Sequence, residues 1–309
     1  MRHTHRKVPL RILSGVPVIQ PGRRGEVLAR VDITFSKRGE RWQAGEPRGE
    51  LLPSDATIAP DAAVAAVETP FEHAARRWLD ETVAEAEEAF PADKARLEDT
   101  ALLDLINDAQ LKATGADLSV TSLLPGGRFE GLPKGHVTMR DLWALYPYEN
   151  RLVVVEIDGA QLKACLEHAA AFYGEAALAG GRIVLTPNPR MIPYDFDALQ
   201  GASYRIDPTE PVGRRVKDLV VRGRPVRPSD RFTVAVNSYR AQGGGGYSAL
   251  RHAKIVKSLP LGIRELLVES FRAAGHLRPV VDHNWVVAPD AVWVPSRPTG
   301  TPARGKPPQ

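Results

Sequence analysis

The sequence predicts an α+β fold with a mixed or antiparallel sheet, and three observations support this prediction. Some segments alternate apolar and polar residues, as half-buried strands do, whereas others repeat apolar residues every three or four positions, as helices do. The two kinds of segment follow one another irregularly, which is not the pattern of a doubly wound fold. Hairpin-like turns at Gly223 and at Asp158-Gly159 favour antiparallel neighbours.

The first 57 residues are rich in short strand-like segments. Residues 16–19 are apolar and are followed by a turn at Pro21-Gly22, and residues 27–35 alternate with the period of a half-buried strand. A turn at residues 37–39 leads to Trp42. These pieces are too few to close a sheet around a core of their own, so we expect them to pack on something else.

A helical connector is predicted to follow. Between residues 60 and 79 the apolar residues Val64, Val67 and Phe71 recur at helical spacing. The run Thr69-Pro70-Phe71-Glu72 also has the pattern of a capping box with proline at the first helical position, so two helices and one helix kinked at Pro70 fit equally well. Residues 81–90 are acidic and ambiguous.

A second body begins near Glu98. Its first helix is predicted to reach Leu111, with Gly115 just beyond its end. Cys165 recurs with apolar neighbours at helical spacing, so we interpret it as a small core residue. After Val294 the chain is too poor in apolar residues to order itself. The remaining predicted elements are strands at 117–124, 151–157, 183–186, 203–207, 216–221 and 231–237, and helices at 138–145, 162–173 and 262–274.

Composition excludes several classes of function. The chain has 309 residues, 43% of them hydrophobic, and 41 Lys and Arg against 37 Asp and Glu, a mild excess of +4. The basic residues are scattered, so an anionic small ligand is a better expectation than a nucleic acid. No apolar run is long enough to span a membrane, and we expect no membrane partner. The single cysteine permits no internal disulfide and no zinc motif.

Four consecutive glycines, Gly243, Gly244, Gly245 and Gly246, follow the predicted strand 231–237 and Tyr239. Glycine loses more backbone freedom on folding than any other residue, so an ordered glycine run indicates that a ligand or a second backbone comes close. The alternative is a flexible surface loop.

A second candidate segment is Tyr146-Pro147-Tyr148-Glu149-Asn150, directly before the predicted strand at 151–157. A proline-stiffened turn can present Tyr148 outward, so that Tyr148 and Tyr239 hold a planar base between them while Asn150 binds its edge. In the alternative interpretation both tyrosines close the core and Asn150 caps the turn.

Residues 137–150 with the valine-rich strand that follows resemble the C-terminal domain of the 5'-nucleotidase family. The nearest branch is that of the 2',3'-cyclic-nucleotide 2'-phosphodiesterase/3'-nucleotidases. Residues 194–197, 201–207, 211–213 and 237–247 follow in the same order, and the likeness extends from about Glu98 to Trp285. The resemblance implies that Tyr148 and Tyr239 stack on the base, that Asn150 contacts it, and that Arg128 belongs to the substrate pocket. Gly245 stands where 5'-nucleotidases carry an acidic residue.

Catalysis in this family takes place in an N-terminal metallophosphatase domain with two divalent metal ions. His3-Thr4-His5 resembles only the last of the metal-binding motifs, and the alternative is that these residues are a basic chain start. Two histidines form an incomplete site, so we expect no stably bound metal and no hydrolysis by this chain alone. We therefore expect a chain that begins inside the catalytic domain, with a remnant of that domain at 1–57, a linker at 58–97, a nucleotide-recognising domain at 98–290 and a disordered tail at 291–309.

The leading hypothesis is the substrate-binding part of a two-metal nucleotide phosphoesterase, a hydrolase of nucleotide catabolism and phosphate salvage. The alternative is a stand-alone or split nucleoside-binding module that partners a separately encoded catalytic domain. By resemblance the expected location is periplasmic or extracellular.

Overall fold

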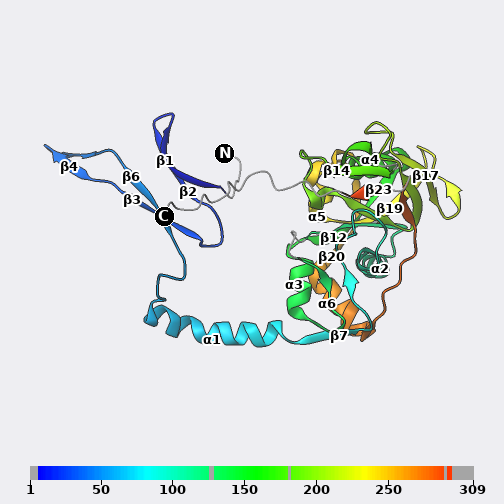
Figure 1. The fold of residues 1–309 in the computed structure, drawn as a ribbon, viewed down its shortest axis with the longest axis horizontal. Helices are drawn as coiled ribbons and strands as arrows, with labels where there is room; N and C mark the ends of the chain where they lie inside the picture. Colours follow the sequence, from blue (N-terminus) through cyan, green and yellow to red (C-terminus); the bar gives the residue numbers. More distant parts are fainter. Residues whose placement is uncertain (1–5, 125–128, 180–181, 289–290, 294–309) are drawn as a thin grey trace. The chain divides into compact units, whose positions relative to one another are not determined.

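The computed structural model describes residues 6–124, 129–179, 182–288 and 291–293. The chain separates into two compact units, Met1–Ala74 and Ala75–Gln309. Figure 1 shows small strand pairs in the first unit and a larger body of sheets and helices in the second. None of the helices in the described part of the chain combines the length and the apolar composition that a membrane crossing requires.

The first unit contains three antiparallel strand pairs. β1 (Lys7–Leu13) pairs with β2 (Val16–Pro21), β3 (Val27–Asp32) with β6 (Arg48–Pro53), and β4 (Phe35–Arg38) with β5 (Arg41–Ala44). Strand character is therefore confirmed here. Val27 is the single buried apolar residue of these strands, whereas Leu28, Phe35 and Trp42 are more than half exposed. The strands of this unit therefore carry several large apolar side chains at the surface.

One helix follows the strand pairs. α1 (Ala62–Leu79) begins where Asp61 Oδ1 accepts hydrogen bonds from the amides of Ala63 and Val64. Pro70 lies inside this helix, and the Thr69 hydroxyl donates to the carbonyl oxygen of Ala65, so Thr69 does not start a second helix. None of its residues is buried.

The second unit is built around a five-stranded mixed sheet with the order β15-β9-β19-β12-β20. Its strands are β15 (Asp197–Gln200), β9 (Leu118–Ser122), β19 (Arg231–Asn237), β12 (Arg151–Asp158) and β20 (Lys254–Gly262). β9 and β19 run parallel, and the other neighbours run antiparallel. β9 and β15 are buried at every residue, which requires cover on both faces. The predicted α+β class is confirmed.

The longer helices of the second unit pack on this sheet or beside it, and local sequence signals set their ends. α2 (Ala101–Thr114) stops at Gly115, whose φ of 68° suits glycine. Capping boxes start α3 (Met139–Leu145) at Thr138 and α4 (Gly159–Ala170) at Asp158. The prediction of a hairpin at Asp158-Gly159 was therefore wrong, because the Asp158 side chain caps a helix. α6 (Ile263–Ala274) confirms the last predicted helix.

Smaller sheets surround this centre. The β17–β18 hairpin confirms the turn at Gly223, and Cys165 is buried as predicted. Sequence patterns missed β20 and also did not resolve β7, which lies in the ambiguous acidic segment. The smaller sheets contain β16 (Ala202–Ile206), β17 (Val216–Val221), β18 (Arg224–Pro225) and β22 (Trp285–Val287); β7 (Thr82–Ala86), β11 (Gly135–Thr138) and β21 (His276–Leu277); β13 (Tyr173–Ala179), β14 (Arg182–Pro187) and β23 (Ala291–Trp293); and β8 (Phe90–Pro91) with β10 (Gly131–Leu132).

Candidate functional site

The antiparallel pairing of β12 with β19 brings the two candidate segments together. Leu152 lies opposite Asn237, so the residues before β12 and those after β19 are at the same edge of the sheet. The amide of Arg151 donates to Ser238 Oγ at 3.2 Å and ties the two segments directly. Tyr148 and Tyr239 are 91 positions apart in the sequence, and this register alone makes them neighbours.

A pocket of about 250 Å³ lies at this edge. Three tyrosines and two asparagines account for most of its lining, and the full set is Leu124, Tyr148, Asn150, Tyr194, Asn237, Tyr239 and Arg240. Tyr148 is 46% exposed and Tyr239 is 45% exposed, so neither ring closes the core. The buried tyrosines of this region are Tyr146 and Tyr247. The structure thus brings Tyr148, Asn150 and Tyr239 together and presents both rings to an open space.

The glycine run is ordered and does not form an extended loop. β19 is followed by α5 (Ser238–Ala241), which Asn237 caps through a 2.8 Å hydrogen bond from the amide of Arg240. Two 3-10 turns continue the chain, η2 (Gly244–Gly246) and η3 (Ser248–Leu250). The backbone of this segment is therefore a short helix followed by two tight turns.

Each glycine of the run meets a specific neighbour. A Cβ at Gly244 would lie 2.5 Å from ring atoms of Tyr239, and one at Gly246 would lie 2.6 Å from the His168 ring. A Cβ at Gly245 would overlap Arg240 and the Asp195 carboxylate, and the φ of Gly245 is +68°. Because an acidic side chain at Gly245 would have to displace this pair, glycine is the residue that fits.

Arg240 is the buried charged residue among those that line the pocket. Its side chain is 1% exposed and pairs with Asp197 at 2.9 Å and with Asp195 at 3.1 Å. Its guanidinium also stacks over the ring of Tyr247, 4.6 Å from the centroid. Burial would lower the pKa of Arg240, but Asp197 and Asp195 hold it above its ordinary value. A buried cation in this setting is compensated and is held in one position.

His168 and Tyr247 brace the glycine run from the other side. The His168 Nε2 atom lies 2.7 Å from the carbonyl oxygen of Gly245, and its ring meets that of Tyr247 edge-on at 4.6 Å. The Tyr247 hydroxyl donates to the carbonyl oxygen of Asp195 at 2.8 Å. His168 and Asp195 therefore hold the glycine run in place, His168 directly and Asp195 through Tyr247. The predicted substrate-binding glycines Gly243, Gly244, Gly245 and Gly246 are not among the lining residues of the 250 Å³ pocket.

A larger pocket of about 680 Å³ adjoins the first, and the two share Leu124 and Tyr194. Arg96, Phe129 and Ile192 are among its other lining residues. The predicted pocket residue Arg128 lies outside the described residues, as do His3 and His5.

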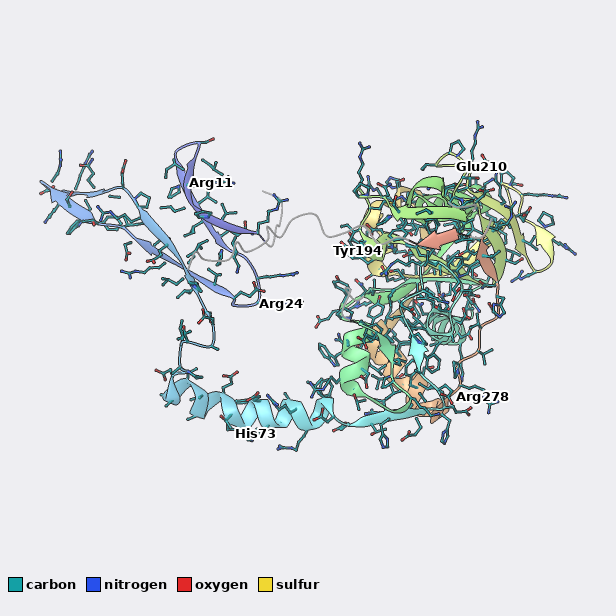
Figure 2. The ribbon with its side chains drawn as sticks, in the orientation of Figure 1. Arg11, Arg24, His73, Tyr194, Glu210 and Arg278 are labelled. Atoms are coloured by element: carbon teal, nitrogen blue, oxygen red, sulfur yellow. The ribbon has the colours of Figure 1, made fainter. Side chains whose placement is uncertain are left out.

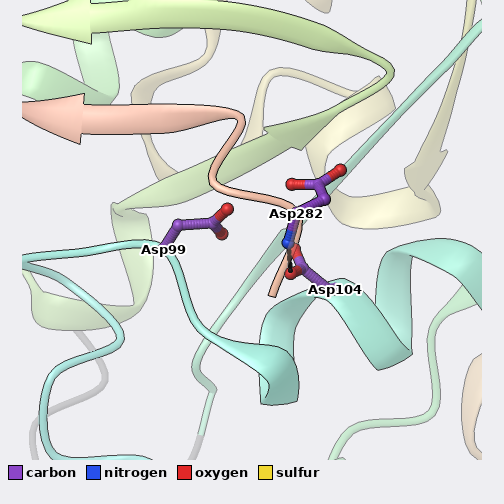
Figure 3. A group of neighbouring side chains, drawn as sticks. All are labelled: Asp99, Asp104 and Asp282. Atoms are coloured by element: carbon purple, nitrogen blue, oxygen red, sulfur yellow. Dashed lines mark hydrogen bonds between the residues drawn. The ribbon is translucent and has the colours of Figure 1, made fainter. Parts of the chain in front are cut away.

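Three aspartates of the second unit also meet, two close in the sequence and one from near the C-terminal end, which the sequence analysis did not anticipate. Carboxylate oxygens of Asp99, Asp104 and Asp282 lie within 4.8 Å of one another (Figure 3). Burial, then the charges of Asp99 and Asp282, raise the pKa of Asp104 to about 8. This group could hold a metal ion, but at neutral pH the raised pKa favours a shared proton. The group contains no histidine, whereas the metal-binding motif that His3-Thr4-His5 resembles does. The three aspartates therefore do not fit the two-metal site that the resemblance implies for the catalytic domain.

Sequence reasoning missed Tyr194, Asn237 and Arg240 as lining residues. Tyr194 lies in the Tyr-Asp-Phe-Asp run, and Arg240 lies between Tyr239 and the glycines. An arginine inside an apolar and glycine-rich run was the available signal, because such a residue needs buried carboxylates as partners.

Comparisons with known proteins agree with this architecture. The family model for "5'-nucleotidase, C-terminal domain" matches residues 82–252. A 2',3'-cyclic-nucleotide 2'-phosphodiesterase/3'-nucleotidase from Salmonella typhimurium is 27% identical over 90% of this chain and 49% of its own length. The trifunctional nucleotide phosphoesterase protein YfkN of Bacillus subtilis is 25% identical over 90% of this chain and 21% of its own length. The chain therefore spans between about a fifth and a half of these relatives.

Solved structures give the same result for the fold. A protein described as a 5'-nucleotidase from Staphylococcus aureus matches with a TM-score of 0.73 and 27% identity, over 92% of this chain and 55% of that one. A 5'-nucleotidase precursor from Thermus thermophilus matches with a TM-score of 0.59 and 21% identity, over 88% of this chain and 52% of that one.

Proposed function

Because the chain belongs to the family of the 5'-nucleotidase C-terminal domain, we propose that it is the substrate-recognising part of a nucleotide phosphoesterase. The 250 Å³ pocket would hold the nucleobase. The observation that carries this proposal is the pair of half-exposed rings, Tyr148 and Tyr239, that line one pocket with the amide of Asn150.

The chemistry of the pocket suits a planar, uncharged, hydrogen-bonding ligand. Aromatic faces bind every base, and each stacked base contributes about 1–3 kcal/mol. The amides of Asn150 and Asn237 offer both donors and acceptors for the edge of a base. Since the guanidinium of Arg240 is neutralised by two aspartates, it does not attract a phosphate into this pocket.

In the parent enzyme another domain would hydrolyse the phosphate ester with two divalent metal ions. The substrates would be 2',3'-cyclic nucleotides and 3'-nucleotides. The described residues of this chain do not provide that metal site. We expect the chain by itself to bind nucleosides without hydrolysing phosphate esters. Sustained release of phosphate from 3'-AMP or 2',3'-cyclic AMP by the pure chain with added Mn²⁺ or Mg²⁺ would contradict this.

Binding is tested by calorimetry with adenosine and 3'-AMP on the full chain. Tyr148→Ala and Tyr239→Ala should each weaken binding about 5- to 150-fold, which is the stacking free energy expressed as a ratio. Trp42→Ala is the control, because Trp42 is also an exposed aromatic residue but lines none of the pockets described above. Affinities unchanged in both tyrosine variants would show that the base does not bind here.

A second candidate is a split enzyme, in which this chain works with a separately encoded catalytic domain. The exposed apolar residues Leu28, Phe35 and Trp42 favour it, since such a surface is usually covered by a partner. Co-purification with a metallophosphatase domain, lost when these three residues are changed to serine, would support the split form. By the same resemblance we infer that the parent enzyme acts outside the cytoplasm, which cell fractionation can test.

A further inference from the structure

Tyr194 lies between the two adjoining pockets. It lines the 250 Å³ pocket with Tyr148 and Tyr239, and with Leu124 it also lines the 680 Å³ pocket. Asn150 and Asn237 line only the smaller pocket. A ligand whose base is bound by the asparagine amides must therefore pass Tyr194 if it extends into the larger space.

The backbone around Tyr194 is held from both sides by arginines. Tyr194 is in the 3-10 turn η1 (Pro193–Asp195). A guanidinium nitrogen of Arg240 donates to the carbonyl oxygen of Tyr194. Arg96 Nε donates to the carbonyl oxygen of Pro193 at 2.8 Å, and Arg96 Nη2 donates to that of Leu123 at 2.7 Å. Two largely buried cations thus fix the peptide that carries the tyrosine, as preorganisation of a binding group requires.

The phenol of Tyr194 is free to meet a ligand. Its side chain is half-buried, and within the residues that the structure describes its hydroxyl makes no hydrogen bond. The three phenols of Tyr148, Tyr194 and Tyr239 line the same pocket. Burial raises the pKa of Tyr194, and the neighbouring Asp195, Tyr239 and Tyr148 raise it further. Figure 2 labels Tyr194 at the border of the second unit.

We propose that Tyr194 is a specificity-determining residue whose hydroxyl hydrogen-bonds the ribose of the bound nucleoside where the sugar leaves the base pocket. The proposal rests on the proposed function, because the base must first occupy the space between Tyr148 and Tyr239. A phenol hydroxyl both donates and accepts, as do the ribose hydroxyls, so the two match. A hydrogen bond of this kind accounts for about a three- to tenfold difference in affinity.

The test compares adenosine with 2'-deoxyadenosine, 3'-deoxyadenosine and 5'-deoxyadenosine by calorimetry on the full chain and on its Tyr194→Phe variant. Wild type should bind one deoxynucleoside about three- to tenfold more weakly than adenosine. In Tyr194→Phe the affinity for adenosine should fall by the same factor, and the penalty for that deoxynucleoside should disappear. Tyr148→Phe and Tyr239→Phe are the matched controls: both keep a stacking ring, and both should keep the penalty.

Equal wild-type affinities for all four nucleosides, or a penalty that persists in Tyr194→Phe, would overturn the assignment. If the base does not stack between Tyr148 and Tyr239, the result is different: adenosine binding is unchanged in Tyr148→Ala and Tyr239→Ala. The two hypotheses can therefore fail separately. Melting curves establish that each variant is folded at the temperature of the titration.

Discussion

Replacing Gly245 with alanine tests whether the glycine run is dictated by packing. Gly245 and Gly115 share a φ of +68°, but a Cβ at Gly115 meets nothing within 4 Å, whereas one at Gly245 overlaps Arg240 and Asp195. Gly115→Ala therefore measures the cost of the left-handed backbone alone, about 1–2 kcal/mol. It is a matched control with the same backbone and open space.

The cost at Gly245 has a second component. The new methyl group must push the Arg240 guanidinium or the Asp195 carboxylate out of a pair in which both side chains are at least 91% buried, because they are 1% and 9% exposed. Breaking a buried pair costs about 3–5 kcal/mol, and a displacement that keeps the Asp197 contact should cost part of that. We expect Gly245→Ala to lower the free energy of unfolding by about 3–6 kcal/mol in all.

Urea unfolding of the full chain, followed by circular dichroism, measures the loss of unfolding free energy in Gly245→Ala and in Gly115→Ala. The quantity that decides is the difference between the two variants, which should be at least about 2 kcal/mol. A difference below about 0.5 kcal/mol, with both variants folded, would refute the argument, since the space around Gly245 would then be irrelevant.

Three further predictions follow from buried groups. Arg240→Lys should lower the free energy of unfolding by about 2–4 kcal/mol, because an ammonium cannot reach Asp195, Asp197 and two carbonyl oxygens at once; urea unfolding measures it, and a loss below 1 kcal/mol contradicts it. Asp104→Asn should raise the free energy of unfolding by about 1–3 kcal/mol at pH 8, with a gain that shrinks toward pH 4. The pKa of Asp104 is raised from 3.8 to about 8 in the folded state, so the native chain retains a proton that the unfolded chain releases. The stability of the wild type therefore falls as the pH rises from about 4 to about 8. A gain in Asp104→Asn that is constant with pH would contradict this. Burial, then Asp197, raise the pKa of Cys165 to about 12, so iodoacetamide at pH 8 should leave the native thiol unmodified and label it after unfolding in urea; rapid native labelling, read by mass spectrometry, would contradict the burial.

Local sequence signals predicted the elements well where periodicity and caps agree. The valine-rich strand β12, the glycine end of α2 and the last helix α6 were each predicted from a few neighbouring residues. β20 was missed because its residues are mostly exposed and carry no clear alternation of apolar positions. The prediction of a hairpin at Asp158-Gly159 was wrong because aspartate and glycine, which are typical of turns, also occur where helices begin.

The candidate site divides in the same way. Tyr148, Asn150 and Tyr239 could be selected from the sequence because each lies beside a strand end or a turn residue. Their meeting in one pocket could not be derived from local pattern, because it depends on the register of β12 against β19. Register is a property of the whole sheet, since it is set by which faces are buried. The aspartate cluster of Asp99, Asp104 and Asp282 is equally a product of chain folding.

By itself the sequence determined the α+β class, the positions of most helices and of the central strands β9, β12 and β19, the strand character of the first 57 residues and the aromatic residues that can stack on a base. These features depend on interactions between residues that are close in the sequence, so local sequence patterns predict them. Only the tertiary structure decided that Gly244, Gly245 and Gly246 accommodate Tyr239, Arg240, Asp195 and His168, and that Tyr194 lines two adjoining pockets. Those contacts join residues far apart in the chain, and close packing leaves each of them one place to lie.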